Sequence, residues 1–203
     1  MASCGLAAGA DEIYRQLKEN LPDSIEVKKT ACLGLCYAEP MAEVIDEEGG
    51  SRVYGNLTSK DVPHFITDTL TARKLVLSDI QDAPANRDLD RQLRIATRNS
   101  GRIDPDKIEE YLDKKGYTAL EKACTQLSRE EVIEEIRGSG LRGRGGAGFP
   151  TGLKWEFARK AASDKKYFIC NADEGDPGAF MDRNILESDP HSVLEGMTIG
   201  AYA

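Results

Sequence analysis

Residues 139–155 read SGLRGRGGAGFPTGLKW, with six glycines, two arginines and one lysine among a few apolar side chains. Glycine has no Cβ, so such a backbone can adopt positive φ angles and turn several N–H groups toward one bound anion. Arg142, Arg144 and Lys154 add positive charge to the same segment. The pattern therefore predicts a loop that binds a phosphate group.

Two better-known glycine motifs do not fit this segment. Residues 143–148 match the G-x-G-x-x-G of dinucleotide-binding turns, but that motif follows a strand. Here Ser128, with a glutamate three residues later, forms a capping box, so residues 128–138 predict a helix before the loop. A Walker loop needs a hydroxyl residue directly after its lysine, and tryptophan follows Lys154. A mobile surface loop remains a further interpretation.

A cluster of polar residues follows the loop. The run KYFICN, Lys166–Asn171, predicts a buried strand that breaks into ADEGDPG. In open α/β sheets, ligands bind at the carboxyl ends of the strands. Asn171 can donate to and accept from a heterocycle or a ribityl chain, and Asp173, Glu174 and Asp176 can accept hydrogen bonds from sugar hydroxyls. The alternative is a turn with solvated acids.

The two motifs together resemble a known family. GLRGRGGAGFPTGLKW followed by ICNADEGDPGAFMDRNILESDPHSVLEGM is similar to the NADH-oxidising flavin subunit of complex I and to the β subunit of NAD-linked hydrogenases and formate dehydrogenases; the likeness covers Leu120–Ala203. The resemblance implies FMN contacts at Gly143, Arg144, Gly145, Gly146, Lys154, Asn171 and Asp173. It implies nicotinamide-nucleotide contacts at Phe149, Lys154, Phe157, Glu174 and Asp176.

The activity that this resemblance implies is hydride transfer between NAD(H) and FMN. The electrons then pass to iron–sulfur subunits of a hydrogenase, a formate dehydrogenase or a complex-I-like assembly. The flavin carries the chemistry, so no catalytic side chain is expected. His191 follows Pro190 at a predicted helix start, and we expect it to be exposed. The alternative function is a non-catalytic electron-transfer or assembly module.

The amino-terminal part has its own cluster of cysteines. Cys4, Cys32 and Cys36 lie in turn-like sequence, and thiolates in such turns are natural iron–sulfur ligands. The hydrophobic pattern around them predicts a helix over Glu12–Leu21, a strand over Ile25–Val27, a hairpin of Met41–Asp46 with Arg52–Tyr54, and a helix starting near Thr58 or Ser59.

The sequences SCGLAAGA and CLGLCYAEP resemble the thioredoxin-like [2Fe–2S] ferredoxin domain that many hydrogenase-type flavin subunits carry at their amino terminus. That domain supplies four cysteines, and this sequence supplies three. Four interpretations stay open: the chain starts late, a substitute residue is the fourth ligand, no cluster binds, or a disulfide forms. Cys124 and Cys170 lie in apolar patterns and are expected in the core.

Composition agrees with two α/β domains in 203 residues, of which 40% are hydrophobic. We predict a thioredoxin-like domain over 1–75, a linker and helical approach over 76–117, and the amino-terminal part of a Rossmann-like FMN and NADH domain over 118–203. The helix expected from Pro190 has no stop signal, and the family's [4Fe–4S] site is expected only beyond Ala203.

Charge and hydropathy exclude some classes of binding partner. The net charge of −8 argues against nucleic acid and anionic membranes. The sequence contains neither an apolar run of membrane-spanning length nor a signal-peptide pattern. We therefore expect a cytoplasmic protein without membrane insertion.

Overall fold

The chain forms two units in a computed structural model that describes residues 1–48, 50–71 and 91–203. Unit 1 comprises Met1–Lys107 and Asp176–Asp189, and unit 2 comprises Ile108–Gly175 and Pro190–Ala203. Residues 76–90 of the predicted linker and helical approach over 76–117 lie outside the described residues. In the described part of the chain, no helix is long and apolar enough to cross a membrane.

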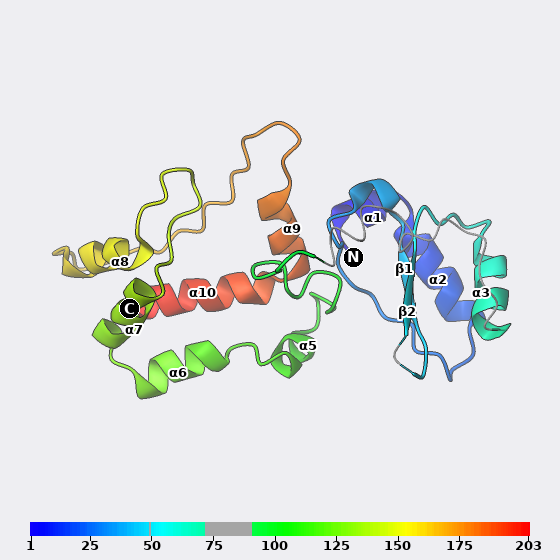
Figure 1. Cartoon of the computed structure of the whole chain (residues 1–203), viewed down its shortest axis with the longest axis horizontal. Helices are drawn as coiled ribbons and strands as arrows, with labels where there is room; N and C mark the ends of the chain where they lie inside the picture. The colour runs from blue at the N-terminus through cyan, green and yellow to red at the C-terminus, as the bar shows by residue number, and fades with distance from the viewer. Residues whose placement is uncertain (49, 72–90) are drawn as a thin grey trace. The chain divides into compact units, whose positions relative to one another are not determined.

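Unit 1 contains four α-helices, one short 3-10 helix and a two-stranded sheet among its described residues (Figure 1). They are α1 (Ser3–Ala7), α2 (Ala10–Asn20), η1 (Cys36–Ala38), β1 (Ala42–Ile45), β2 (Ser51–Tyr54), α3 (Val62–Thr71) and α9 (Met181–Ser188).

Helix α2 forms one wall of the core of unit 1. Gly9, with φ of 97°, turns the chain into the helix, and two acidic residues in the first turn favour its positive end. Ile13 and Leu17 lie one turn apart on the buried face and pack with Tyr54 and Phe65. The rings of Tyr54 and Phe65 meet edge to face with centroids 5.5 Å apart. The predicted helix at Glu12–Leu21 is confirmed, with a slightly earlier start.

The predicted hairpin is also confirmed. Strands β1 and β2 pair antiparallel, with Ala42 opposite Tyr54 and Ile45 opposite Ser51. The predicted strand at Ile25–Val27 is wrong, since the structure assigns no strand there. Ile25 and Val27 are half-buried and alternate with exposed residues. The alternating pattern therefore indicated correctly that one side of the segment is buried, but burial of one side does not require a hydrogen-bonded partner strand.

Unit 2 is helical. Its described elements are α5 (Ile108–Asp113), α6 (Thr118–Gln126), α7 (Arg129–Gly138), α8 (Thr151–Lys160) and α10 (Pro190–Tyr202). Helix α6 lies beside α10, and α7 lies beside α8. The predicted capping box before the glycine-rich segment is confirmed, because the Ser128 hydroxyl accepts from the Glu131 amide and the Glu131 carboxylate accepts from the Ser128 amide.

A buried carboxylate ties three elements of unit 2 together. Glu195 of α10 is only 8% exposed. It accepts hydrogen bonds from the Tyr111 hydroxyl at 2.5 Å, the Tyr117 amide at 2.9 Å and the Leu120 amide at 3.1 Å. Burial alone would raise the pKa of this carboxyl, but the hydrogen bonds outweigh burial and lower it. Glu195 therefore caps α6 from a distant part of the chain.

The predicted buried strand at Lys166–Asn171 is wrong for this structure. The segment is extended but belongs to no sheet, and Tyr167 and Ile169 are 76% and 80% exposed. A strand needs a neighbour for its N–H and C=O groups, and the described residues provide none here. Cys124 and Cys170 are likewise exposed, contrary to expectation. The observed fold is helix-rich, with one small two-stranded sheet among the described residues.

We predict that replacing Glu195 with glutamine destabilises the chain at neutral pH. Charge-assisted hydrogen bonds contribute about 1.5–3 kcal/mol each when buried, so we expect a loss of about 1–3 kcal/mol in the free energy of unfolding. A lowered pKa in the folded state means that this stabilisation is present above the pKa of unfolded glutamate, about 4.3, and is lost as pH falls through the folded-state pKa.

Urea unfolding at several pH values measures this difference. The gap between wild type and Glu195→Gln should be widest near pH 7 and should shrink below about pH 4. Glu121→Gln, a charge-matched change at an exposed position on α6, serves as the control and should be close to neutral. A gap that does not change with pH would contradict the assigned role.

Candidate functional site

The glycine-rich segment forms a loop that is closed at its base. The Thr151 amide donates to the Leu141 carbonyl at 2.9 Å, and the Gly143 amide donates to the Phe149 carbonyl at 2.8 Å. Arg142 reaches across the loop and donates from Nη1 to the Gly148 carbonyl at 3.0 Å. The loop thus leaves α7 and returns to α8 as a narrow hairpin-like turn.

The tip of this loop is open backbone. Gly146 and Gly148 have φ angles of 100° and 60°, a region that side chains disfavour. An ideal Cβ at Gly145, Gly146 or Gly148 would meet nothing within 4 Å. The glycines therefore serve the turn and leave the peptide groups at the tip accessible to a ligand.

The positively charged side chains of residues 139–155 have two different roles. Arg142 is used inside the loop, whereas Arg144 and Lys154 are exposed and make no ion pair within the described residues. Lys154 lies in the first turn of α8, where the helix dipole also favours an anion. Arg144, Lys154 and the N-terminus of α8 can together attract a phosphate group.

Two exposed aromatic rings flank this region. Phe149 and Phe157 have ring centroids 6.5 Å apart, tilted by 48°. Both side chains are largely exposed, although they carry no polar atoms. Such a pair offers an apolar surface on which a flat heterocycle can pack.

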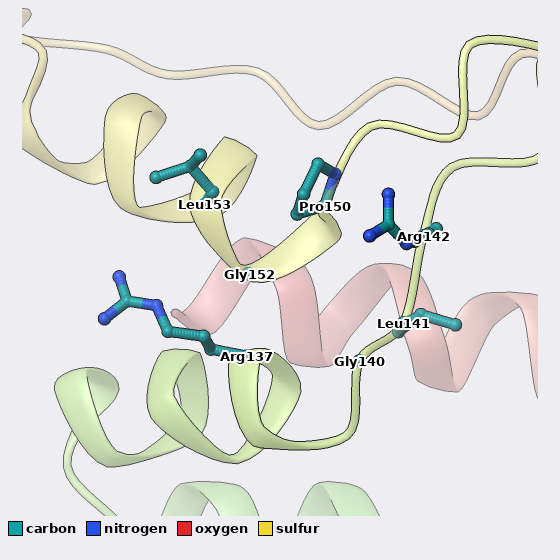
Figure 2. Close-up of a pocket in the computed structure, with 7 residues that line it drawn as sticks. All are labelled: Arg137, Gly140, Leu141, Arg142, Pro150, Gly152 and Leu153. Carbon is teal, nitrogen blue, oxygen red and sulfur yellow. The ribbon is translucent and has the colours of Figure 1, made fainter.

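A pocket lies at the base of the loop rather than at its tip. Its volume is about 310 Å³, and its lining residues are Arg137, Gly140, Leu141, Arg142, Pro150, Gly152 and Leu153. Figure 2 shows Arg142 beside the Pro150 ring, while Arg137 lies on the other side of Gly152. Arg137 pairs with Glu156 of α8, so this part of the pocket wall is fixed by an interhelical ion pair.

The acidic residues predicted for the site are only partly brought together. The Asn171 side chain accepts from the Asp173 amide at 3.0 Å, which shapes a local turn. Both side chains are exposed, and within the described residues neither makes a hydrogen bond or ion pair with the glycine loop. Glu174 is half-buried, and Asp176 is exposed in unit 1. Their predicted roles stay predictions.

The three predicted thiol ligands do converge. The sulfur atoms of Cys4, Cys32 and Cys36 all lie within 4.8 Å of one another. Cys4 is on α1, Cys36 begins η1, and Cys32 is in the loop before it. The Gly34 amide donates to the Cys32 sulfur at 3.2 Å, and Gly34 has a φ of 89°. Three segments of unit 1 thus build one thiol cluster.

The electrostatics of this cluster favour neutral thiols while nothing is bound. Burial is the largest effect that raises the pKa of Cys32, and the neighbouring Glu39 raises it further. Burial also raises the pKa of Cys4. A bound metal would supply the positive charge that thiolates need, so binding would release protons. This donor set suits an iron–sulfur cluster or a single soft divalent ion.

A family comparison identifies the segment that contains the glycine loop. The model of the Nuo51 FMN-binding domain matches residues 136–203. The resemblance inferred from the loop and from the acidic run is thereby confirmed, and all the predicted flavin and nucleotide contacts lie within the matched segment.

The chain is also similar to curated proteins. The chain is 58% identical over 113 residues to NADP-reducing hydrogenase subunit HndC of Solidesulfovibrio fructosivorans, covering 56% of this chain and 23% of that protein. It is 57% identical over 88 residues to an NADH-quinone oxidoreductase subunit of Rhizobium meliloti, covering 43% of this chain and 21% of the relative. The chain therefore spans less than a quarter of the length of these relatives.

An NADH-quinone oxidoreductase subunit of Escherichia coli is a further relative. It is 47% identical over 97 residues, which cover 47% of this chain and 22% of the relative. The similar solved structures include a crystal structure of NAD+-reducing [NiFe]-hydrogenase in the air-oxidized state. Its alignment covers 100% of this chain and 34% of the other, with 26% identity and a TM-score of 0.43.

Sequence reasoning missed several residues in both units. His191 is half-buried rather than exposed: its Nδ1 lies 2.9 Å from the Tyr117 hydroxyl, and its ring stacks on Tyr111. The helix-start pattern at Pro190 located the residue but could not indicate its distant partners. Glu39 was also missed, because a glutamate three residues after a cysteine carries no motif of its own.

We predict that Gly152→Ala, in the segment that matches the FMN-binding domain model, loosens the base of the loop. A Cβ at this position would lie 2.7 Å from the backbone nitrogen of Arg137 and 2.8 Å from its Cα, so α8 would have to move away from α7. Overpacking of this kind costs about 1–3 kcal/mol. Thermal and urea unfolding of the variant measure the loss.

Gly145→Ala is the matched control for this substitution. Gly145 has no atom within 4 Å of an ideal Cβ, and its φ is not positive, so its change in stability should stay within about 0.5 kcal/mol. Equal destabilisation by the two variants would show that the close approach at Gly152 has no special role.

The burial of the thiols predicts an order of reactivity. Exposed Cys124 and Cys170 should react first with iodoacetamide at neutral pH, and Cys32 should react last, because it is 4% exposed and its pKa is raised. Mass spectrometry of timed digests measures the order. The chain unfolded in urea provides the reference, in which all five cysteines should react at similar rates. Rapid labelling of Cys32 in the folded chain would be inconsistent with the thiol cluster.

Proposed function

We propose that this chain is part of a flavin-dependent NAD(P)H oxidoreductase subunit. In proteins of this kind, FMN accepts hydride from NADH and passes single electrons to iron–sulfur clusters. The observation that carries the proposal is the match of residues 136–203 to an FMN-binding domain, since this segment holds the open glycine loop and the exposed cations Arg144 and Lys154. The work of the protein is to bind and orient the flavin and the nucleotide.

The proposed FMN contacts rest on the loop geometry. Open peptide groups at Gly145 and Gly146 offer donors, and Arg144 and Lys154 offer charge to the FMN phosphate. Gly143 is proposed as a backbone contact at the base of the loop, where its own amide donates to the Phe149 carbonyl. Asn171 and Asp173 are proposed for the rest of the flavin, where an amide and a carboxylate can bind its ring and ribityl groups.

The proposed nucleotide side combines aromatic and polar residues. Phe149 and Phe157 present exposed rings, and Lys154, three residues before Phe157 on α8, is proposed to attract a nucleotide phosphate. Glu174 and Asp176 are proposed to accept hydrogen bonds from sugar hydroxyls. NAD(H) is the expected substrate, and the names of the relatives include both NADP and NADH.

Unit 1 is proposed to hold a [2Fe–2S] cluster at Cys4, Cys32 and Cys36, in a thioredoxin-like ferredoxin domain. The support is the convergence of the three sulfur atoms within 4.8 Å. A cluster at this position would transfer single electrons. The proposed partners are iron–sulfur subunits of a multi-subunit hydrogenase, formate dehydrogenase or complex-I-like assembly in the cytoplasm.

One observation favours a second function, a non-catalytic electron-transfer or assembly module. Tyr167 and Ile169, in the segment before the proposed FMN residues Asn171 and Asp173, are largely exposed. Side chains that line a completed cofactor site are normally buried or covered by the ligand. In this alternative the cysteine cluster is the functional part, and the glycine loop contributes only to assembly.

We predict that the 203-residue chain binds FMN more weakly than nanomolar, because the proposed contacts are exposed and not held against one another. Titration under anaerobic conditions, followed by quenching of flavin fluorescence and by absorption before and after NADH, measures this. Lys154→Ala should weaken binding by about tenfold, as expected for a charge-assisted phosphate contact of about 1.5 kcal/mol or more.

Lys114→Ala is the control, since it removes the same charge from an exposed position at the end of α5. Weak binding that depends on Lys154 and bleaching of the flavin by NADH would support the oxidoreductase. Absence of FMN binding at any concentration would instead favour the non-catalytic module. Nanomolar binding would contradict the predicted weakness and support the flavin site directly.

A further inference from the structure

The end of helix α9 contacts two segments of unit 1 that carry thiols of the cluster. Ser188 is the last residue of this helix, and Asp189 follows it as the C-cap. Residues 187–189 lie in unit 1 and also in the segment that matches the FMN-binding domain model. Ser188 and Asp189 are each only 1% exposed, and buried polar side chains of this kind require hydrogen-bond partners.

The first of these contacts holds the start of helix α1. The Ser3 amide donates to Glu187 Oε2 at 2.9 Å, and the Ser3 hydroxyl donates to the other carboxylate oxygen. Ser3 is the first residue of α1, and Cys4 follows it directly. Amides in the first turn of a helix have no partner within the helix, so an acceptor from another element stabilises that turn. Glu187 therefore fixes the turn that carries Cys4, although it lies 184 positions away from Ser3 in the chain.

The second contact is a pair of buried hydrogen bonds. The Asn99 side chain donates to Asp189 Oδ2 at 2.7 Å, and the hydroxyl oxygens of Ser100 and Ser188 lie 2.9 Å apart. Because the Ser188 hydroxyl donates to the Asn184 carbonyl, it accepts from the Ser100 hydroxyl. The four side chains of the two pairs are at most 5% exposed, so water does not compete for these bonds.

The segment held in this way packs against the loop of Cys32. Gly101 has a φ of 73°, and an ideal Cβ there would lie 2.3 Å from Leu33 Cδ2 and 3.7 Å from the Ala31 carbonyl oxygen. Ala31 and Leu33 are the two neighbours of Cys32, which is 4% exposed. The backbone that follows the two buried pairs thus supports the loop that presents the Cys32 thiol.

We propose that Glu187, Ser188 and Asp189 are positioning residues for the thiol site of unit 1. Glu187 holds the helix start that carries Cys4, and the other two hold the segment that supports Cys32. The inference rests on the proposed iron–sulfur site and adds to it a contribution from the segment that matches the FMN-binding domain model. A metal site needs its thiolates at fixed separations, so groups that orient its ligands strongly affect metal affinity.

A general stabilising role would give a different result from a positioning role. If the contacts of α9 only stabilised unit 1 as a whole, losing any of them would expose Cys4 and Cys32 to the same extent. A positioning role releases one segment at a time. Loss of the Glu187 carboxylate should then affect Cys4, and loss of the Ser188 hydroxyl should affect Cys32.

Timed labelling of the metal-free 203-residue chain with iodoacetamide, read at each cysteine by mass spectrometry, measures this difference. In Glu187→Ala, Cys4 should react about fivefold faster than in the wild type, because loss of about one net hydrogen bond shifts local opening on that scale. The rate at Cys32 should not change. In Ser188→Ala, Cys32 should gain about fivefold and Cys4 should not change.

Two further variants serve as controls. Glu187→Gln keeps one acceptor oxygen, so its rate at Cys4 should lie between those of the wild type and Glu187→Ala. Glu19→Ala makes the same substitution at an exposed position of α2 in the same unit and should label as the wild type does. Far-UV circular dichroism shows whether each variant folds. If Ser188→Ala does not, Glu187→Ala and its two controls decide the outcome.

Anaerobic reconstitution with ferrous iron and sulfide connects the labelling to the metal site. Glu187→Ala should lose its iron at a chelator concentration about tenfold lower than the wild type and Glu19→Ala. Selective labelling together with this loss would support the positioning role. Equal acceleration of Cys4 and Cys32, or no acceleration at either, would overturn it. A wild-type chain that takes up no iron would overturn the proposed cluster, while the labelling pattern would still decide whether α9 positions the thiols.

Discussion

The arrangement of unit 2 depends on one buried carboxylate. Glu195 of α10 receives the Tyr111 hydroxyl from α5 and the backbone amides that begin α6. Amides at the start of a helix lack partners within the helix, so a buried helix start needs an acceptor from elsewhere. Since Glu195 supplies it, α5, α6 and α10 share one set of hydrogen bonds, and His191 closes the same region by stacking on Tyr111.

The glycine loop, unlike the region around Glu195, is shaped by hydrogen bonds between residues of the loop itself. These bonds leave two of its positively charged side chains available to a ligand. The two ends of the loop are joined by backbone hydrogen bonds, and the close approach of Gly152 to Arg137 fixes how near α8 lies to α7. The Arg142 side chain already donates a hydrogen bond to the Gly148 carbonyl within the loop. Arg144 and Lys154 make no ion pair within the described residues, so an incoming phosphate would not have to compete with one there.

The thiol cluster shows how burial and reactivity are balanced in unit 1. Burial raises the pKa of Cys32 and Cys4, which keeps the metal-free thiols protonated and poorly reactive. Because the site is buried, a bound cation would stabilise the thiolates strongly by supplying positive charge beside them. The Gly34 amide donates to the Cys32 sulfur, a hydrogen bond that would also stabilise a thiolate.

Local patterns in the sequence determined the capping box at Ser128, the hairpin that ends at Tyr54 and the turn-forming glycines. They also determined the similarity of residues 136–203 to the FMN-binding domain model. Each of these depends on neighbouring residues or on a contiguous motif. The apolar run at Lys166–Asn171 was misread, since a strand exists only when a distant segment pairs with it. Tertiary structure decided the capping of α6 by Glu195, the burial of His191 and the convergence of the three cysteines. Such contacts join residues that no local periodicity relates.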